Sequence, residues 1–218
     1  DVKLPPLLTT PDVIDVQRIL GDMVNAEMKS CALEVSSIGL EQHRVDAVEF
    51  DVAIFTNFTH DHLDYHGTME NYFEAKKVLF DNLSDRQVAV YNVDDPRGQD
   101  IVKNCKAHCF SYGVVNEADY RAKNIQIMAD HTVFTLEVMR KEYRVETNLI
   151  AIEHVGERHY RLVEETLRYY SRYRDLEEII AAIPSISQID GRMEKVEEGQ
   201  PFNILVDFAH TPDGLKQI

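Results

Sequence analysis

Short apolar runs alternate with amphipathic segments along the first half of the chain, and this alternation limits the fold more than any other feature. The expected strands are Cys31–Val35, Val52–Thr56, Val88–Tyr91 and His108–Tyr112, and the helices between the later ones are Met69–Leu83 and Arg97–Cys105. A further helix before them is expected to have Thr10 as its N-cap and Pro11 as its first residue, and to bury one apolar stripe. Strands and helices that alternate in this way predict an α/β fold with a mostly parallel, doubly wound sheet.

The pattern changes between residues 122 and 147, where apolar side chains recur with a period of two. The period-two runs are Ile125–Met128, Thr132–Val138 and Glu142–Glu146, and turns are expected at Ala129-Asp130 and Arg140-Lys141. This pattern is typical of a small antiparallel meander at the edge of the sheet.

The last third of the chain is predicted to contain a domain boundary. Residues 154–183 are heavily charged and predicted helical, residues 185–191 resemble a linker, and Phe202–Phe208 predicts a strand that opens a new unit. We therefore expect residues 1–190 to form one domain and residues 191–218 to begin a C-terminal α/β domain. Because a domain rarely ends on a strand followed by a new helix start, we expect the chain to be an internal fragment.

Charge and composition exclude several classes of protein. A formal net charge of -15 and a pI near 4.9 disfavour binding to nucleic acid or to an anionic membrane surface, since both need a basic face. The three cysteines are an odd number and lack the second pair that a zinc site needs, so free thiols in a reducing compartment are expected. The sequence also lacks an apolar run of membrane-spanning length and a signal peptide, and a cytoplasmic location is therefore expected.

The densest group of chemically active side chains follows the strand that ends near Asn57. The loop after it contains His60, Asp61, His62, Asp64 and His66. The carboxyl ends of strands are where open α/β sheets bind ligands, so this loop is a candidate metal site. The alternative is that these side chains cap the next helix. Spacing alone leaves Mg²⁺, Mn²⁺ and Zn²⁺ open.

Two other strand ends carry carboxylates. Glu34 lies in an apolar run, where a charge is costly unless it is paired or binds a metal, but a solvated glutamate at a strand end is equally compatible. Asp94 and Asp95 follow another strand and are predicted to be structural residues of a turn.

An ordered set of motifs resembles the MurE ligases of the Mur ligase family. The motifs are TTPD at 9–12, EVSS at 34–37, QHR at 42–44, FTN at 55–57, DHLDYHGTMENY at 61–72, NVDD at 92–95, GRMEKV at 191–196 and VDFAHTPDGL at 206–215. They cover nearly the whole chain except residues 149–189. The resemblance implies the central ATPase domain followed by the first strand of the C-terminal domain. The implied reaction is ATP-dependent addition of meso-diaminopimelate or L-lysine to UDP-N-acetylmuramoyl-L-alanyl-D-glutamate, through an acyl phosphate, during peptidoglycan synthesis.

The resemblance also implies roles for individual residues. The implied substrate-binding residues are Thr9, Thr10, Ser36, Gln42 and Arg44, and the implied nucleotide-binding residues are Asn57, Arg192, Asp207 and His210. Glu34 and His62 match positions that hold Mg²⁺, and Lys76 matches a lysine carried as a carbamate that faces the metal. His62 and Lys76 are thus the expected catalytic residues, whereas Lys77 is expected to be an ordinary exposed lysine. The expected partners are small molecules only, and the expected state is a monomer.

Several departures from the family pattern limit what this chain is expected to do alone. The phosphate-binding loop ending in Gly-Lys-Thr should precede Asp1, and Ile38 and Leu8 replace the usual His and Asn. Residues 151–174 match nothing in the family, through divergence or, as we prefer, a slipped reading frame. We therefore expect the isolated chain to be inactive. The alternatives are a non-catalytic UDP-muramoyl-peptide-binding remnant, another ligase of this fold such as folylpolyglutamate synthase, and a metallohydrolase.

Overall fold

The computed structural model describes residues 8–128, 131–148, 176–185, 194–196, 198–202, 204–207 and 209. Its helices are α1 (Val13–Asn25), α2 (Ser37–Glu41), α3 (Leu63–His66), α4 (Met69–Asp81), α5 (Gly98–Ile101) and α7 (Leu176–Ala182), with a 3-10 turn at Ile183–Ser185. Its strands are β1 (Val52–Phe55), β2 (Val88–Asn92), β3 (His108–Gly113), β4 (Tyr120–Ile127), β5 (Thr132–Val138), β6 (Lys141–Thr147), β7 (Glu194–Val196) and β8 (Ile204–Val206).

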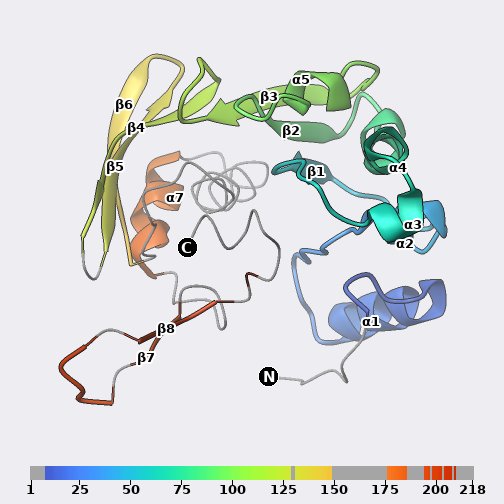
Figure 1. Ribbon diagram of the computed structural model, residues 1–218, viewed down its shortest axis with the longest axis horizontal. Helices are drawn as coiled ribbons and strands as arrows, with labels where there is room; N and C mark the ends of the chain where they lie inside the picture. Colours follow the sequence, from blue (N-terminus) through green and yellow to red (C-terminus); the bar gives the residue numbers. More distant parts are fainter. Residues whose placement is uncertain are drawn as a thin grey trace.

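Six strands form one sheet in the order β1-β2-β3-β4-β5-β6 (Figure 1). The pairs from β1 to β4 are parallel, and those from β4 to β6 are antiparallel. This confirms the predicted α/β fold, in which a mostly parallel sheet continues into an antiparallel meander. The meander begins earlier than predicted, at Tyr120, because the first residues of β4 pair with the end of β3.

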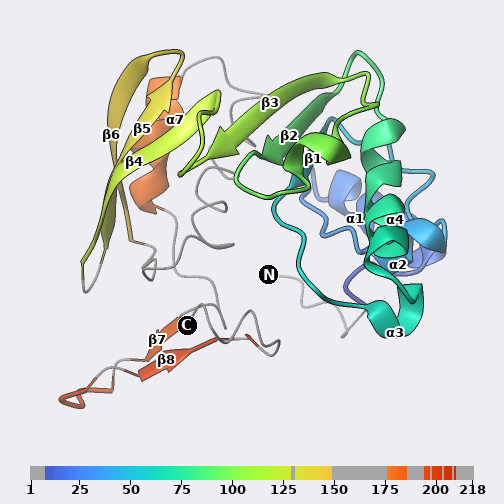
Figure 2. The ribbon, with the colours of Figure 1, turned by 45° about the horizontal axis from the view of Figure 1, so that its top comes forward.

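The sheet packs on both faces, as expected for a doubly wound architecture. Adjacent β2 residues point to opposite sides: Ala89 belongs to a core cluster with Phe73 and Phe80 of α4, while Val90 belongs to a cluster with Leu176 at the start of α7. Figure 2 shows α4 at the β1 end of the sheet and α7 beside the meander. Because successive side chains of a strand point to opposite faces of the sheet, the apolar central strands supply side chains to two separate cores.

The predicted strand Cys31–Val35 is wrong, because residues 28–36 form no helix or strand although all are described. Among the described residues no strand pairs with this segment, and the sheet ends at β1. Without a partner strand no hydrogen-bonded ladder forms. The side chains of Cys31, Ala32 and Glu34 are accordingly exposed.

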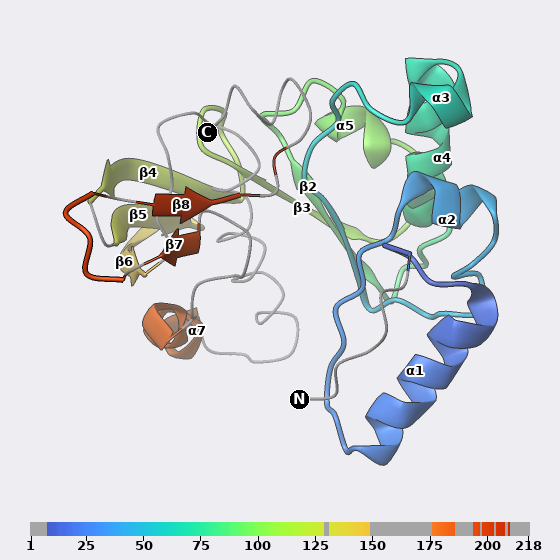
Figure 3. The same ribbon diagram turned by 60° about the horizontal axis from the view of Figure 1, so that its bottom comes forward.

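Three helix and turn predictions need smaller corrections. Helix α1, which Figure 3 shows along its length, begins at Val13 with Asp12 as N-cap, later than predicted. Of its apolar stripe only Val16 is buried. Helix α5 spans four residues, not the nine predicted. The β5–β6 turn lies at Met139 and Arg140, both with positive φ, one residue before the predicted turn.

The predictions for the C-terminal end can be compared with the structure only in part. Helix α7 lies within the predicted helical section, whose residues 154–175 are outside the described part. Within the predicted strand Phe202–Phe208, β8 is shorter and pairs antiparallel with β7 as a separate two-stranded sheet. No helix in the described residues is long and apolar enough to cross a membrane.

Candidate functional site

Thr10 joins the chain before α1 to the loop that leads into α2. Its hydroxyl donates to the Glu34 carbonyl at 3.0 Å and accepts from the Ser36 N–H at 2.8 Å. Thr10 is 0% exposed, so these bonds are closed to water. Gly39 is required opposite, because a Cβ there would lie 2.8 Å from Thr10 Cγ2. The Thr10 hydroxyl thus shapes the loop, and Thr9 beside it is the exposed member of the pair.

Arg44 hydrogen-bonds to the same group of residues. Its Nη1 donates to the Thr10 carbonyl at 2.7 Å, and its Nε and Nη2 donate to Gln42 Oε1 at 3.0 and 2.5 Å. The Asp12 carboxylate lies 3.6 Å away, and the Arg44 side chain is only 14% exposed. Most of the guanidinium is therefore fixed from within the chain, which pre-orients the part that still faces solvent.

The predicted substrate-binding residues therefore gather around one loop. Ser36 caps α2, since its hydroxyl accepts from the Gly39 N–H at 3.0 Å, and Gln42 Nε2 donates to the Tyr65 hydroxyl at 3.2 Å. The second bond links this loop to α3, where the predicted metal ligand His62 is the N-cap residue.

His62 has a strained backbone. Its φ of 53° and ψ of 23° lie in the left-handed region, which costs a non-glycine residue about 1–2 kcal/mol. Its N–H donates to Asp61 Oδ1 at 2.7 Å, and its Nε2 lies 3.6 Å from Asp61 Oδ2. The ring is half exposed, so a strained residue here presents an imidazole to solvent.

The other polar residues of this loop divide into exposed and buried groups. His60 and Asp64 are exposed, whereas His66 is buried, so the five predicted side chains do not form one metal-binding set. Within the described residues, no three His, Cys, Asp or Glu side chains converge as a metal site. Spacing could not reveal this division, because it depends on where α3 turns into the core.

Tyr72 of α4 is the aromatic centre of the site. Its ring lies edge-on to His62 at 5.7 Å between centroids and stacks on His66 at 5.3 Å. Lys76 Nζ lies 5.1 Å from the centre of the same ring, on the next turn of the helix. One buried tyrosine therefore contacts both expected catalytic residues; it ends the motif at residues 61–72, but the sequence assigned it no role.

Lys76 and Lys77 differ in a way that the sequence did not indicate. Lys76 is partly exposed. The prediction for Lys77 is wrong, because its side chain is buried and its ammonium pairs with the Asp81 carboxylate one turn further on. Lys77 shares the buried face of α4 with Phe73 and Phe80, and this position on the helix explains its burial.

Asp94 and Asp95 are structural, as predicted. Asp94 accepts backbone N–H bonds from Val114, Val115 and Asn116 at 2.6 to 3.0 Å. Asp95 accepts from the N–H of Phe58 at 2.6 Å and thereby holds the chain just after Asn57. Burial raises the pKa of the Asp95 carboxyl, against the opposing effect of its backbone bonds and of the nearby Arg97 guanidinium.

Fewer contacts are known for the remaining predicted residues. Asn57 is half-buried and Glu34 is exposed. Asp207 follows β8, and its Oδ1 accepts from the Ala209 N–H at 2.8 Å. Arg192 and His210 lie outside the described residues.

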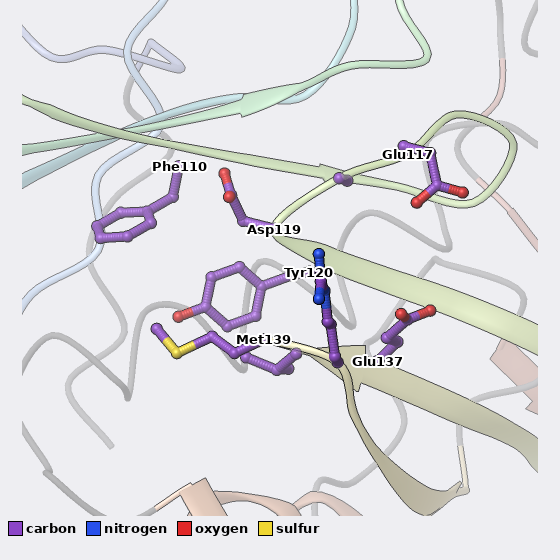
Figure 4. Close-up of a pocket in the computed structure, with 9 residues that line it drawn as sticks. Phe110, Glu117, Asp119, Tyr120, Glu137 and Met139 are labelled. Atoms are coloured by element: carbon purple, nitrogen blue, oxygen red, sulfur yellow. The ribbon is translucent and has the colours of Figure 1, made fainter.

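A pocket of about 280 Å³ lies at the other end of the sheet, between β3, β4 and the β5–β6 turn (Figure 4). Its carboxylates already have partners: Asp119 accepts from Ser111, Glu117 pairs with Arg121, and Glu137 pairs with Lys123. The pocket contains none of the residues predicted to bind substrate, nucleotide or metal.

Comparison with known proteins gives a consistent result. Residues 4–156 match the model of the Mur ligase middle domain. The chain is 38% identical over 213 residues to "UDP-N-acetylmuramoyl-L-alanyl-D-glutamate–2,6-diaminopimelate ligase" of Halalkalibacterium halodurans, a match that covers 96% of this chain and 43% of the relative.

Solved structures agree with this match. A ligase structure of the same name has a TM-score of 0.80 and 30% identity, over 98% of this chain and 44% of the other. MurF ligase from Thermotoga maritima in complex with ADP has a TM-score of 0.65 at 19% identity, over 80% and 39%, and so shares the fold. The chain thus spans less than half the length of these proteins. Because the family model covers well over half of the sequence and the sheet has the same architecture, the chain belongs to the Mur ligase family.

Proposed function

We propose that this chain is the central part of an ATP-dependent ligase that adds 2,6-diaminopimelate to UDP-N-acetylmuramoyl-L-alanyl-D-glutamate, with L-lysine as the alternative amino acid. The observation that carries the proposal is the 38% identity, over 96% of this chain, to a ligase named for that reaction. Since the chain spans 43% of that relative, the activity is proposed for the whole protein and not for the chain alone.

The proposed reaction is a phosphoryl transfer followed by an acyl transfer. ATP donates its γ-phosphoryl group to the terminal carboxylate of the substrate, which gives an acyl phosphate and ADP. The amine then attacks the acyl carbon, and the tetrahedral intermediate expels phosphate as the amide forms. Both steps concentrate negative charge, which a chain of net charge -15 must offset locally.

The loop around Arg44 is proposed to bind the UDP-muramoyl substrate. Thr9, Ser36, Gln42 and Arg44 provide hydroxyl, amide and guanidinium groups, and Thr10 fixes the loop that carries them. A guanidinium that Gln42 and a backbone carbonyl hold in place can meet a carboxylate or a pyrophosphate with little further loss of side-chain freedom.

Glu34, His62 and Lys76 are proposed to hold Mg²⁺. A lysine ammonium would repel the cation, so the set fits a metal only when CO₂ has converted Lys76 into a carbamate, which supplies an anionic oxygen. The partial exposure of Lys76 and the exposed Glu34 and His62 side chains are compatible with this set. Bound Mg²⁺ would offset the charge of the transferred phosphoryl group.

Asn57, Arg192, Asp207 and His210 are proposed to lie near the nucleotide once the C-terminal domain closes. The ADP bound to a MurF ligase of the same fold supports a nucleotide site in this architecture. We place the start of that domain near residue 191. Dependence on ATP favours the cytoplasm, and we propose that the protein acts there as a monomer.

The substrate role can be tested on the chain itself. Titration calorimetry with UDP-N-acetylmuramoyl-L-alanyl-D-glutamate should show binding that weakens about 10-fold in Arg44→Lys, equivalent to about 1.4 kcal/mol. Arg86→Lys, an exposed arginine away from the loop, is the matched control and should bind like the wild type. Equal binding by both variants would remove Arg44 from the substrate site.

The reaction class needs a second measurement on a whole protein that contains this chain. Formation of ADP and of a new amide with diaminopimelate or lysine would support the ligase and identify the amino acid. Binding of the UDP-muramoyl peptide without any turnover would favour a non-catalytic remnant. Hydrolysis without ATP, with retained zinc, would favour a metallohydrolase, and use of a folate substrate would favour folylpolyglutamate synthase.

A further inference from the structure

Ser37, His66 and Glu41 form a linear polar chain that none of the predicted roles uses. Ser37 Oγ lies 2.9 Å from His66 Nε2, and His66 Nδ1 lies 3.1 Å from Glu41 Oε2. Ser37 is 1% exposed and the His66 side chain also 1%, whereas the Glu41 side chain is 53% exposed. The chain therefore runs from a buried hydroxyl to a carboxylate that meets solvent.

The chemistry of the end groups fixes the proton on the ring. A carboxylate can only accept, so His66 Nδ1 must carry the hydrogen that faces Glu41. In the neutral ring, Nε2 is then an acceptor, and the Ser37 hydroxyl donates to it. The serine thus has a buried partner for its own hydrogen.

The order hydroxyl, imidazole, carboxylate resembles the nucleophile, base and carboxylate of a serine hydrolase. Burial decides against that role, because a substrate cannot reach a hydroxyl oxygen in a residue that is 1% exposed. The same burial suits a structural link, since water cannot compete for the bond between Ser37 and His66.

The link joins the two loops that carry the predicted site residues. Ser37 is the first residue of α2, directly after Ser36 and before the loop with Gln42 and Arg44. His66 is the last residue of α3, which begins after His62, and Gly67 with φ 75° ends that helix. The bond between Ser37 and His66 spans 29 positions in the sequence.

The link continues from His66 to the expected catalytic residues through Tyr72. The two rings stack with an interplanar angle of 25°, and the far contacts of Tyr72 are the His62 ring and Lys76 Nζ. Movement of the His66 ring therefore displaces the surface against which His62 and Lys76 rest.

We propose that Ser37, His66 and Glu41 are positioning residues, which hold the loop of Arg44 against the loop of His62 and set the positions of His62 and Lys76 through Tyr72. The positioning role of these three residues rests on the proposed metal role of His62 and Lys76. The hydrogen-bonded link and its tautomer do not depend on that role.

The link can be tested by nitrogen NMR on the ¹⁵N-labelled chain. The expected His66 ring carries a proton on Nδ1, which faces the Glu41 carboxylate. Ser37→Ala should shift the Nε2 resonance, Glu41→Gln should shift the Nδ1 resonance, and both should also shift the ring signals of His62. The matched control is Asp46→Asn, which alters an exposed carboxylate 2.9 Å from His43 and should leave both rings unchanged.

A His66 Nδ1 that carries no proton, or His62 signals that stay unchanged in both variants, would overturn the proposal. If Ser37→Ala fails to fold, Glu41→Gln decides alone, since the Glu41 side chain is half exposed.

A metal titration separates the positioning role from the proposed function. Mn²⁺ binding, followed by electron paramagnetic resonance in bicarbonate buffer, should weaken about 10-fold in Ser37→Ala and Glu41→Gln, as is typical when support behind a metal ligand is lost. Equal Mn²⁺ affinity in wild type and both variants would overturn positioning. If the wild-type chain binds no Mn²⁺, the metal role of His62 and Lys76 fails, and the NMR result alone decides the link.

Discussion

Replacement of Thr10 by valine tests whether its buried hydroxyl builds the substrate loop. Valine keeps the shape of threonine but removes the bonds to the Glu34 carbonyl at 3.0 Å and the Ser36 N–H at 2.8 Å. A buried group left without a partner costs about 1–3 kcal/mol. Because the Thr10 side chain is fully buried, the Glu34 carbonyl and the Ser36 N–H both lose a partner on the side that faces residue 10. We therefore expect Thr10→Val to lower the free energy of unfolding by about 2 kcal/mol.

Thr10→Ser is the matched control, because it keeps the hydroxyl and removes one buried methyl group. That change should cost about 1 kcal/mol, within the range for a single methyl deletion in a core. Urea unfolding followed by circular dichroism measures the stability of both variants, and the denaturant slope should stay unchanged. The reasoning is refuted if the valine variant is as stable as wild type, or more stable than the serine variant.

Three further predictions concern groups whose environment only the structure shows. Lys77→Met should change the free energy of unfolding by less than about 1 kcal/mol, whereas Asp81→Ala should lower it by about 2 kcal/mol. The difference arises because only Asp81→Ala leaves the buried Lys77 ammonium unpaired. Equal losses of stability in urea unfolding would contradict this. The Asp95 carboxyl has a pKa raised above 3.8, so the native state binds its proton more tightly than the unfolded state does. Its contribution to stability is therefore present at low pH and is lost as pH rises through the folded pKa. The stability of wild type relative to Asp95→Asn should accordingly fall as pH rises above 3.8; a rise would show the opposite shift. Partial desolvation and the neighbouring Cys105 raise the pKa of Cys109, an exposed residue, to about 11. At about pH 8 roughly 0.1% of Cys109 is then thiolate, against about 25% of a free thiol with a pKa near 8.5. Iodoacetamide should therefore modify Cys109 about 200-fold more slowly than it modifies a cysteine peptide. Comparable modification rates, measured by mass spectrometry, would disprove this.

The sequence by itself determined the fold class and the family. The short apolar run Val88–Tyr91 and the period-two run Thr132–Val138 each predicted a strand that the sheet contains, and the ordered motifs from residue 9 to residue 215 predicted a Mur ligase. Local patterns succeed here because a strand in the middle of a sheet has neighbours on both sides, and its alternation is enough to decide which face each side chain takes.

Only the tertiary structure decided which residues of the site are exposed and which are buried. Cys31–Val35 has the composition of a strand but pairs with none of the described strands, because a ladder is a property of two segments and not of one. Lys76 and Lys77 are neighbours in sequence, yet one faces Tyr72 and the other enters the core, because helical rotation places them on different sides of α4. The link from Ser37 to His66 joins residues 29 positions apart, and such a contact depends on how helices pack, which no local pattern encodes.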